Sequence, residues 1–117
     1  MAGRLSDLTR ALTNKQPVAI GSYERSAEEL KWAIDRNYIH IKFIKARFEM
    51  GVQLIQSQCE YGNGDFEKAS GKIHLVGALI LKYDKVKLVA DIDLATCEGT
   101  GYLIPLNDEE WDKIWED

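Results

Sequence analysis

The sequence predicts an α+β fold in a single domain that spans residues 1–117. Three observations lead to this prediction. The first half contains a long segment with apolar residues at helical spacing, the second half contains alternating strand patterns between turns, and the chain closes on a capped helical pattern. With 117 residues, of which 45% are hydrophobic, the chain is long enough to bury a substantial core.

The N-terminal part predicts a short helix and a short strand. Leu5, Leu8 and Leu12 lie on one face of a helix over residues 4–13. A helix of this length is marginal alone and needs a surface to dock on. Residues 17–20, which begin with a proline, could form a short edge strand, because proline cannot donate a backbone hydrogen bond.

The central segment admits two interpretations. Ser26 followed by Glu29 forms a capping-box pattern and Gly62 suits a helix stop, so a long helix over about 26–61 is favoured. Its apolar residues would form two stripes on opposite sides, which is typical of a helix sandwiched between its own sheet and a partner. The β-branched and aromatic content favours instead a shorter helix over 27–36 followed by strands, and this is the alternative within the predicted fold.

The second half predicts an antiparallel β-meander and a terminal helix. Residues 72–82 are apolar on both faces in the middle, which indicates a central strand. Residues 86–94 alternate as a half-buried strand, and residues 102–105 return as a short strand that ends in a proline. Asn107 followed by three acidic residues predicts the N-terminus of a short helix.

Charge and composition limit the classes of function that this chain can have. Residues 1–58 carry nine basic and six acidic residues, a balance of +3, and residues 59–117 carry six basic and thirteen acidic residues, a balance of −7, which together give −4. A net acidic chain argues against non-specific nucleic-acid binding over the whole surface. No apolar run approaches the roughly 20 residues of a membrane span, and the N-terminus has no apolar signal core. We therefore expect a cytoplasmic protein without a membrane contact, whose Cys59 and Cys97 are reduced thiols.

Two sets of residues are candidates for binding. The one basic and aromatic cluster lies at residues 36–48, and its predicted ligand-binding residues are Arg36, His40, Lys42, Lys45 and Arg47. On a strand face this cluster would suit base stacking and phosphate contacts. The second apolar stripe of the long helix and the terminal tryptophans predict an interface made of Ile39, Phe43, Met50, Leu54, Trp111 and Trp115.

Catalytic and metal-binding patterns are weak. Asp91 and Asp93 project from one face of a predicted strand and could bind a hard cation or act as an acid–base pair, but no further ligand lies at a recognised spacing. The two histidines, His40 and His74, and the two cysteines could form a zinc site only if the fold brought them together. We therefore predict neither a metal nor a cofactor.

These patterns favour a non-enzymatic protein-interaction or regulatory module. The predicted partner is a second copy of the chain, in a homodimer or larger homo-oligomer, or another protein. The alternative is a protein that binds a small ligand, a nucleotide or a nucleic acid through the basic and aromatic cluster.

Overall fold

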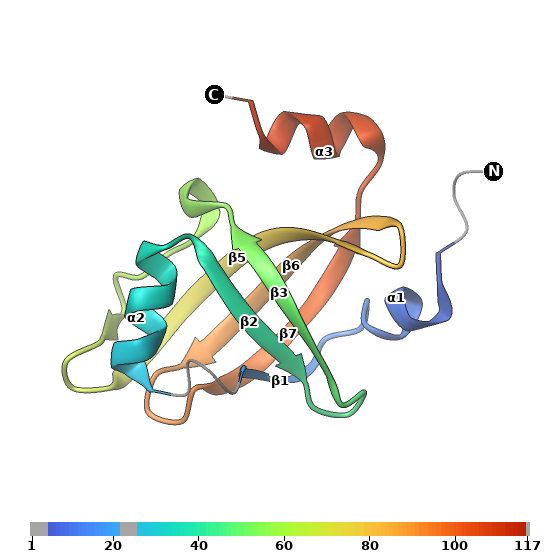
Figure 1. The fold of residues 1–117 in the computed structure, drawn as a ribbon. Helices are drawn as coiled ribbons and strands as arrows, with labels where there is room; N and C mark the ends of the chain where they lie inside the picture. The colour runs from blue at the N-terminus through green and yellow to red at the C-terminus, as the bar shows by residue number, and fades with distance from the viewer. Residues whose placement is uncertain (1–4, 22–25, 117) are drawn as a thin grey trace.

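The computed structural model describes residues 5–21 and 26–116, and it is built around an antiparallel β-barrel (Figure 1). The barrel wall consists of β1 (Gln16–Ile20), β2 (Tyr38–Phe43), β3 (Phe48–Leu54), β5 (Ser70–Leu81), β6 (Asp84–Asp93) and β7 (Glu98–Pro105). The helical elements are α1 (Asp7–Ala11), α2 (Ala27–Asp35), the 3₁₀-helix η1 (Gln56–Gln58) and α3 (Asp108–Ile114). The two-residue strand β4 (Gly64–Asp65) pairs only with β5.

The strands follow one another around the barrel in the order β3-β2-β1-β7-β6-β5, and every pair is antiparallel. A pairing between β3 and β5 closes the circle. Alternate residues of each strand point inward and fill the interior. The largest fully buried side chains are Phe43, Leu12, Ile20, Leu30, Ile39, Ile41, Ile73, Leu75, Leu88, Ile92, Leu94 and Leu103. The barrel is therefore a packed core, and a ligand would have to bind on its outside.

The predicted α+β class with a long central helix is wrong. The chain leaves the helix at Asn37, whose φ of 66° is left-handed and whose N–H donates to the Ile34 carbonyl at 2.9 Å. This is a standard helix stop, which asparagine tolerates better than most residues. Strands β2 and β3 follow as a hairpin, so the helix of the alternative interpretation is present locally, but within a barrel. Helical spacing in residues 38–61 competed with strand pairing, and the strands on either side of this hairpin, β1 and β5, come from other parts of the sequence.

The predicted edge strand is also placed differently. Strand β1 pairs with β2 on one side and with β7 on the other, so it is internal. Val18 and Ile20 are fully buried, which accounts for this position. Pro17 lies opposite Thr100 on the exposed face, near the start of the strand, where a missing N–H is tolerated.

Helix α1 lies at the right of Figure 1, at the opposite end of the barrel from α2. Ser6 caps it, because the Ser6 hydroxyl accepts a hydrogen bond from the Thr9 N–H at 3.1 Å. Leu12, directly after the helix, is fully buried, and its carbonyl accepts a hydrogen bond from the Leu103 N–H at 2.9 Å. The Asp84 carboxylate accepts a further hydrogen bond from the Ser6 N–H at 3.0 Å. These contacts supply the docking surface that a short helix requires.

The contact between Asp84 and α1 depends on pH. The Ser6 N–H, and after it the Thr9 hydroxyl, hold the pKa of Asp84 below its ordinary value of 3.8. A carboxyl whose pKa is lower in the folded state contributes stability above its unfolded pKa, and this contribution is lost as the pH falls through the folded pKa. Acidification below about pH 4 therefore weakens the docking of α1.

We expect Asp84→Asn to lower the free energy of unfolding at neutral pH by less than about 1 kcal/mol, because an accessible carboxylate is screened by solvent. The difference from the native chain should be smaller at about pH 3 than at neutral pH, because the native carboxyl takes up a proton as the pH falls through its folded pKa. Urea unfolding followed by circular dichroism at both pH values measures it. A difference that grows on acidification would contradict this assignment.

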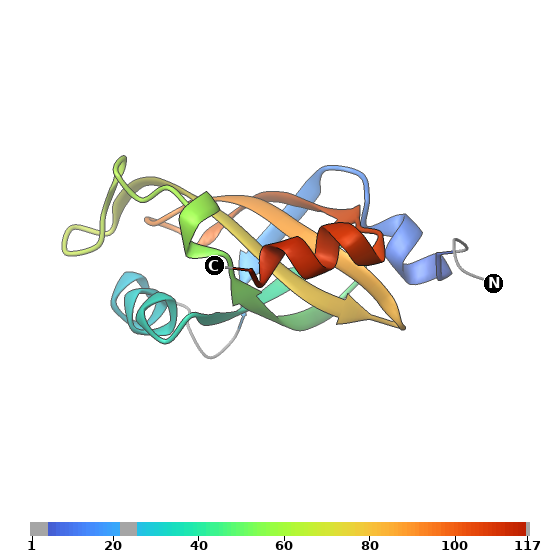
Figure 2. The same cartoon turned by 90° about the horizontal axis from the view of Figure 1, so that it is seen from above.

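Helix α3 confirms the capped terminal helix. The Asn107 side chain accepts a hydrogen bond from the Glu110 N–H at 2.7 Å, and the Glu110 carboxylate accepts one from the Asn107 N–H at 2.9 Å. Helix α3 lies over the outer side of the barrel wall (Figure 2), and its Trp111 and Ile114 pack on a small apolar patch that includes Val76. No helix in residues 5–21 and 26–116 is long and apolar enough to cross a membrane. Cys59 and Cys97 are not joined in a disulfide.

Candidate functional site

The five basic residues predicted to bind a ligand are spread from the end of α2 through β2 to the β2–β3 turn. Arg36 caps the C-terminal end of α2, His40 and Lys42 project from the outer face of β2, and Lys45 and Arg47 lie in the turn between β2 and β3. Six residues of strand span about 17 Å, so the two ends of this set are far apart. Only His40 and Lys42 share a face, and their binding role stays a prediction.

Most of the predicted interface lies inside the barrel. The inward-facing residues of this set are Ile39, Phe43, Met50 and Leu54, each exposed by 5% or less. A partner could not reach them while the barrel is folded, because the second apolar stripe is the inner face of two strands. Trp111 packs against the barrel, and Trp115 remains 40% exposed with its ring 5.4 Å from that of Trp111.

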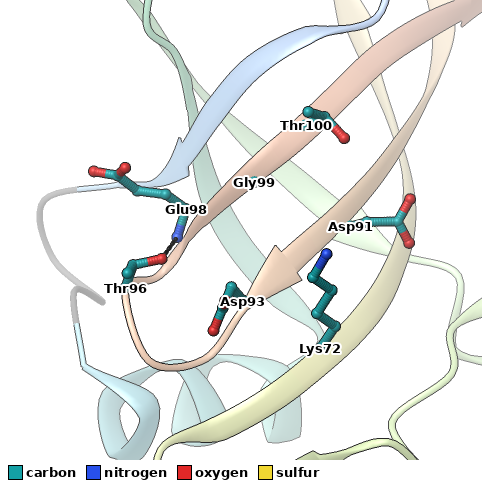
Figure 3. Close-up of a pocket in the computed structure, with 7 residues that line it drawn as sticks. All are labelled: Lys72, Asp91, Asp93, Thr96, Glu98, Gly99 and Thr100. Atoms are coloured by element: carbon teal, nitrogen blue, oxygen red, sulfur yellow. Dashed lines mark hydrogen bonds between the residues drawn. The ribbon is translucent and has the colours of Figure 1, made fainter.

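A polar hollow of about 340 Å³ lies on the outer wall beside the β6–β7 turn, and we call it the acidic pocket (Figure 3). Its lining residues are Lys72, Asp91, Asp93, Thr96, Glu98, Gly99 and Thr100. The strand register brings them together, because Asp93 lies opposite both Lys72 and Glu98. Figure 3 shows the Lys72 side chain reaching up between Asp91 and Asp93.

The two aspartates of the acidic pocket are engaged in local structure. Asp91 Oδ1 lies 2.8 Å from His74 Nδ1 on the neighbouring strand. Asp93 Oδ1 accepts a hydrogen bond from the Ala95 N–H at 2.9 Å, which stabilises the β6–β7 turn. In the part of the chain that the structure describes, no three acidic, histidine or cysteine side chains are grouped so as to hold a metal ion. The geometry therefore assigns Asp91 and Asp93 to cross-strand pairing and turn formation.

The barrel wall is incompletely closed between β3 and β5. These strands pair only through Gln53 with Ala78 and Leu54 with Gly77, although β3 has seven residues and β5 has twelve. Figure 1 shows that they cross near the end of β3 and then diverge towards the β2–β3 and β5–β6 turns. We call the parts of these two strands that are not paired with each other, 48–52 of β3 and 79–81 of β5, the β3–β5 split.

Backbone groups of both strands face the β3–β5 split. The Leu54 N–H donates to the Asn37 carbonyl, and hydrogen-bonded positions alternate along an antiparallel pair, so the N–H and C=O of Gly51 point away from β2. The Ile55 N–H donates to the Val76 carbonyl, so by the same alternation the backbone groups of Ile80 point towards β3. No residue in 5–21 or 26–116 pairs with Gly51 or Ile80 on that side.

Apolar side chains surround the β3–β5 split. Phe48 and Leu79 pack against the core from its two sides, but both remain partly exposed. Exposed apolar side chains lie nearby as well, since Ile44 in the β2–β3 turn is 40% exposed, Ile80 near the end of β5 57% and Tyr83 in the β5–β6 turn 99%. A rim of exposed aromatic and aliphatic residues beside an apolar floor is typical of a protein-binding surface.

The β5–β6 turn beside the β3–β5 split is strained. Lys82 and Tyr83 form a two-residue hairpin turn with φ values of 51° and 72°. A turn with two left-handed residues normally uses asparagine and glycine, which adopt this conformation at little cost. Residues held in such conformations cost of order 1–3 kcal/mol each and concentrate at functional sites.

The sequence holds few signals for the β3–β5 split. Gly51 and Gly77 interrupt strand patterns, and an isolated glycine in a strand indicates a bulge or a close backbone approach. At Gly77 a Cβ atom would lie 2.7 Å from the Gln53 carbonyl oxygen, so the crossing of β3 and β5 requires glycine there. No model of a known family matches this chain, and no curated protein matches it in sequence.

Proposed function

We propose that the protein is a non-enzymatic interaction module that binds an extended segment of a partner protein at the β3–β5 split. The observation that carries this proposal is the short pairing of β3 with β5, which ends after two residues. A strand edge with unpaired N–H and C=O groups is a template for an added strand, and such addition is a common mode of peptide recognition. An added strand would complete the barrel wall.

The apolar surroundings favour the same function. A strand placed along Gly51 would cover the partly exposed Phe48 and Leu79 with its inward side chains. The fully exposed Tyr83 and the exposed Ile80 lie at the end of β5, where they would contact the partner's flanks. Tyrosine is one of the residue types enriched at binding hot spots.

A partner other than a second copy of this chain is our preferred form of the proposal. The homodimer predicted from the sequence relied on residues that now lie inside the barrel, such as Phe43 and Met50. The alternative function, binding of a nucleotide or nucleic acid, relies on His40 and Lys42, which project from the outer face of β2. It stays a prediction, and the experiment below includes it.

The test is amide hydrogen exchange in the presence of a synthetic peptide of eight residues that alternates valine and serine. We expect slower exchange at Gly51 and Ile80, because their N–H groups would donate to the added strand. The control is the same peptide with proline replacing the two central serines, which removes the backbone donors on the pairing edge and should abolish the protection.

Comparing the two peptides with an oligonucleotide distinguishes strand addition from nucleic-acid binding. Protection of Gly51 and Ile80 by the alternating peptide, and its absence with the proline peptide, supports strand addition. Equal protection by both peptides, or by neither at millimolar concentration, overturns it. A single-stranded oligonucleotide that perturbs His40 and Lys42, with no peptide effect at Gly51, would support the nucleic-acid alternative instead.

A further inference from the structure

Basic side chains lie in the two hairpin turns at the diverging end of β3 and β5, which border the β3–β5 split. Lys45 and Arg47 occupy the β2–β3 turn, and Lys82 occupies the β5–β6 turn. All three are exposed, as is Lys42 on the outer face of β2. The split is therefore flanked by cations from two hairpin turns that are more than 30 residues apart in the sequence.

The acidic side chains nearest to these turns in the sequence are directed elsewhere. The Asp84 carboxylate accepts a hydrogen bond from the Ser6 N–H at 3.0 Å and anchors α1. The Glu49 carboxylate lies over Gly21 and the Cβ atom of His40, on the outer face of the wall. The Asp84 and Glu49 carboxylates are thus directed to α1 and to the outer wall, whereas Lys45, Arg47 and Lys82 are exposed in the two turns.

The charges of the barrel are separated along its length. Strand β6 begins at Asp84, beside the β5–β6 turn, and ends at Asp93 in the acidic pocket. Ten residues of strand span about 30 Å, which exceeds the screening length of about 8 Å at physiological ionic strength. The acidic pocket therefore does not neutralise the cations at the split, even though the whole chain has a net charge of −4.

We infer that the partner segment is acidic, with glutamate or aspartate residues alternating with the apolar residues that enter the β3–β5 split. This inference rests on the proposed function and names the chemistry of its partner. Alternate residues of an added strand point inward and outward, so one set would cover Phe48 and Leu79. The other set would lie between Lys45 on one turn and Lys82 on the other, where carboxylates would form ion pairs.

The experiment replaces the serines of the alternating peptide with glutamate in one version and with lysine in another. We expect the glutamate peptide to bind about tenfold more tightly than the lysine peptide, since each accessible ion pair contributes modestly. Isothermal titration calorimetry at about 0.05 M and about 0.5 M salt measures both affinities, and the higher salt should reduce the preference. Exchange at Gly51 and Ile80 is recorded in the same complexes.

A charge-reversed protein and a matched control locate the effect. Lys45→Glu combined with Lys82→Glu should bring the preference for glutamate below about threefold. Lys31→Glu combined with Lys68→Glu changes the net charge equally at two other exposed lysines and should leave the preference intact. Circular dichroism verifies that both double variants fold.

The outcomes separate this inference from the proposed function. Protection of Gly51 and Ile80 by all the alternating peptides, with no preference for glutamate, overturns the acidic partner and leaves strand addition standing. A preference that both double variants lose equally also overturns it, because the attraction would then come from net charge. Protection of the same amides by concentrating the protein alone, with dimers in light scattering, would assign the split to a second copy of the chain.

Discussion

Replacing Phe43 with alanine is expected to lower the free energy of unfolding by about 3–5 kcal/mol. Phe43 is fully buried and is among the largest side chains of the barrel interior. It lies opposite Val18 on β1 and opposite Phe48 on β3, so its removal opens a cavity between three strands. A small domain has a total stability of roughly 5–15 kcal/mol, so this single change would remove a large share of it.

Urea unfolding followed by circular dichroism measures this loss, and Lys42→Ala is the matched control. Lys42 directly precedes Phe43 on the same strand and points outward, so its replacement should change the stability by less than about 0.5 kcal/mol. The experiment also distinguishes the role of Phe43 in the barrel interior from the interface role predicted from the sequence. If Phe43 were an interface residue, its replacement would lower the oligomer mass in light scattering and leave the stability of the monomer unchanged. That result would contradict the barrel.

Local signals predicted the elements that depend on neighbouring residues. The Asn107 cap and the acidic turn after it define α3, and the predicted strands over residues 72–82 and 86–94 correspond to β5 and β6. Each of these elements carries its cap, turn or alternation within about ten residues. The predictions therefore needed no information about which strands meet in space.

The closed barrel had no comparable local signal. Strand β1 pairs with β7, and β3 pairs with β5, across separations that leave no mark in the intervening sequence. Residues 38–61 satisfy both a helical and a strand period, and the β2–β3 hairpin with its outer neighbours β1 and β5 decides for strands. Asn37 was the one local sign of the break, because a left-handed asparagine ends a helix as glycine does.

The candidate site was hidden for the same reason. The β3–β5 split consists of strand edges that lack a neighbour, and a sequence shows which residues can form a strand but not which edge stays open. The Lys82–Tyr83 turn was equally hard to foresee, since its left-handed residues are neither glycine nor asparagine. Lys45 and Arg47 were selected for their charge, and the structure places them beside the opening.

Replacing Gly77 with alanine is expected to lower the free energy of unfolding by about 2–3 kcal/mol, because it forces apart the pairing of Gln53 and Leu54 with β5. A Cβ atom at Gly77 would lie 2.7 Å from the backbone oxygen of Gln53, and it would overlap the Val52 side chain. A side chain can turn aside, but the backbone oxygen belongs to the pair of Gln53 with Ala78 and moves only if β3 moves.

Amide exchange locates the damage, and Gly62→Ala is the control. The Ile55 N–H, which donates to the Val76 carbonyl at 2.8 Å beside the crossing, should exchange faster in Gly77→Ala, whereas pairs between β6 and β7 should be affected only through global unfolding. A Cβ atom at Gly62 meets nothing within 4 Å, so that variant should be as stable as the native chain or slightly more so. Equal stability of both variants would mean that the barrel does not close at Gly77, and the β3–β5 split would then extend along the whole of β3.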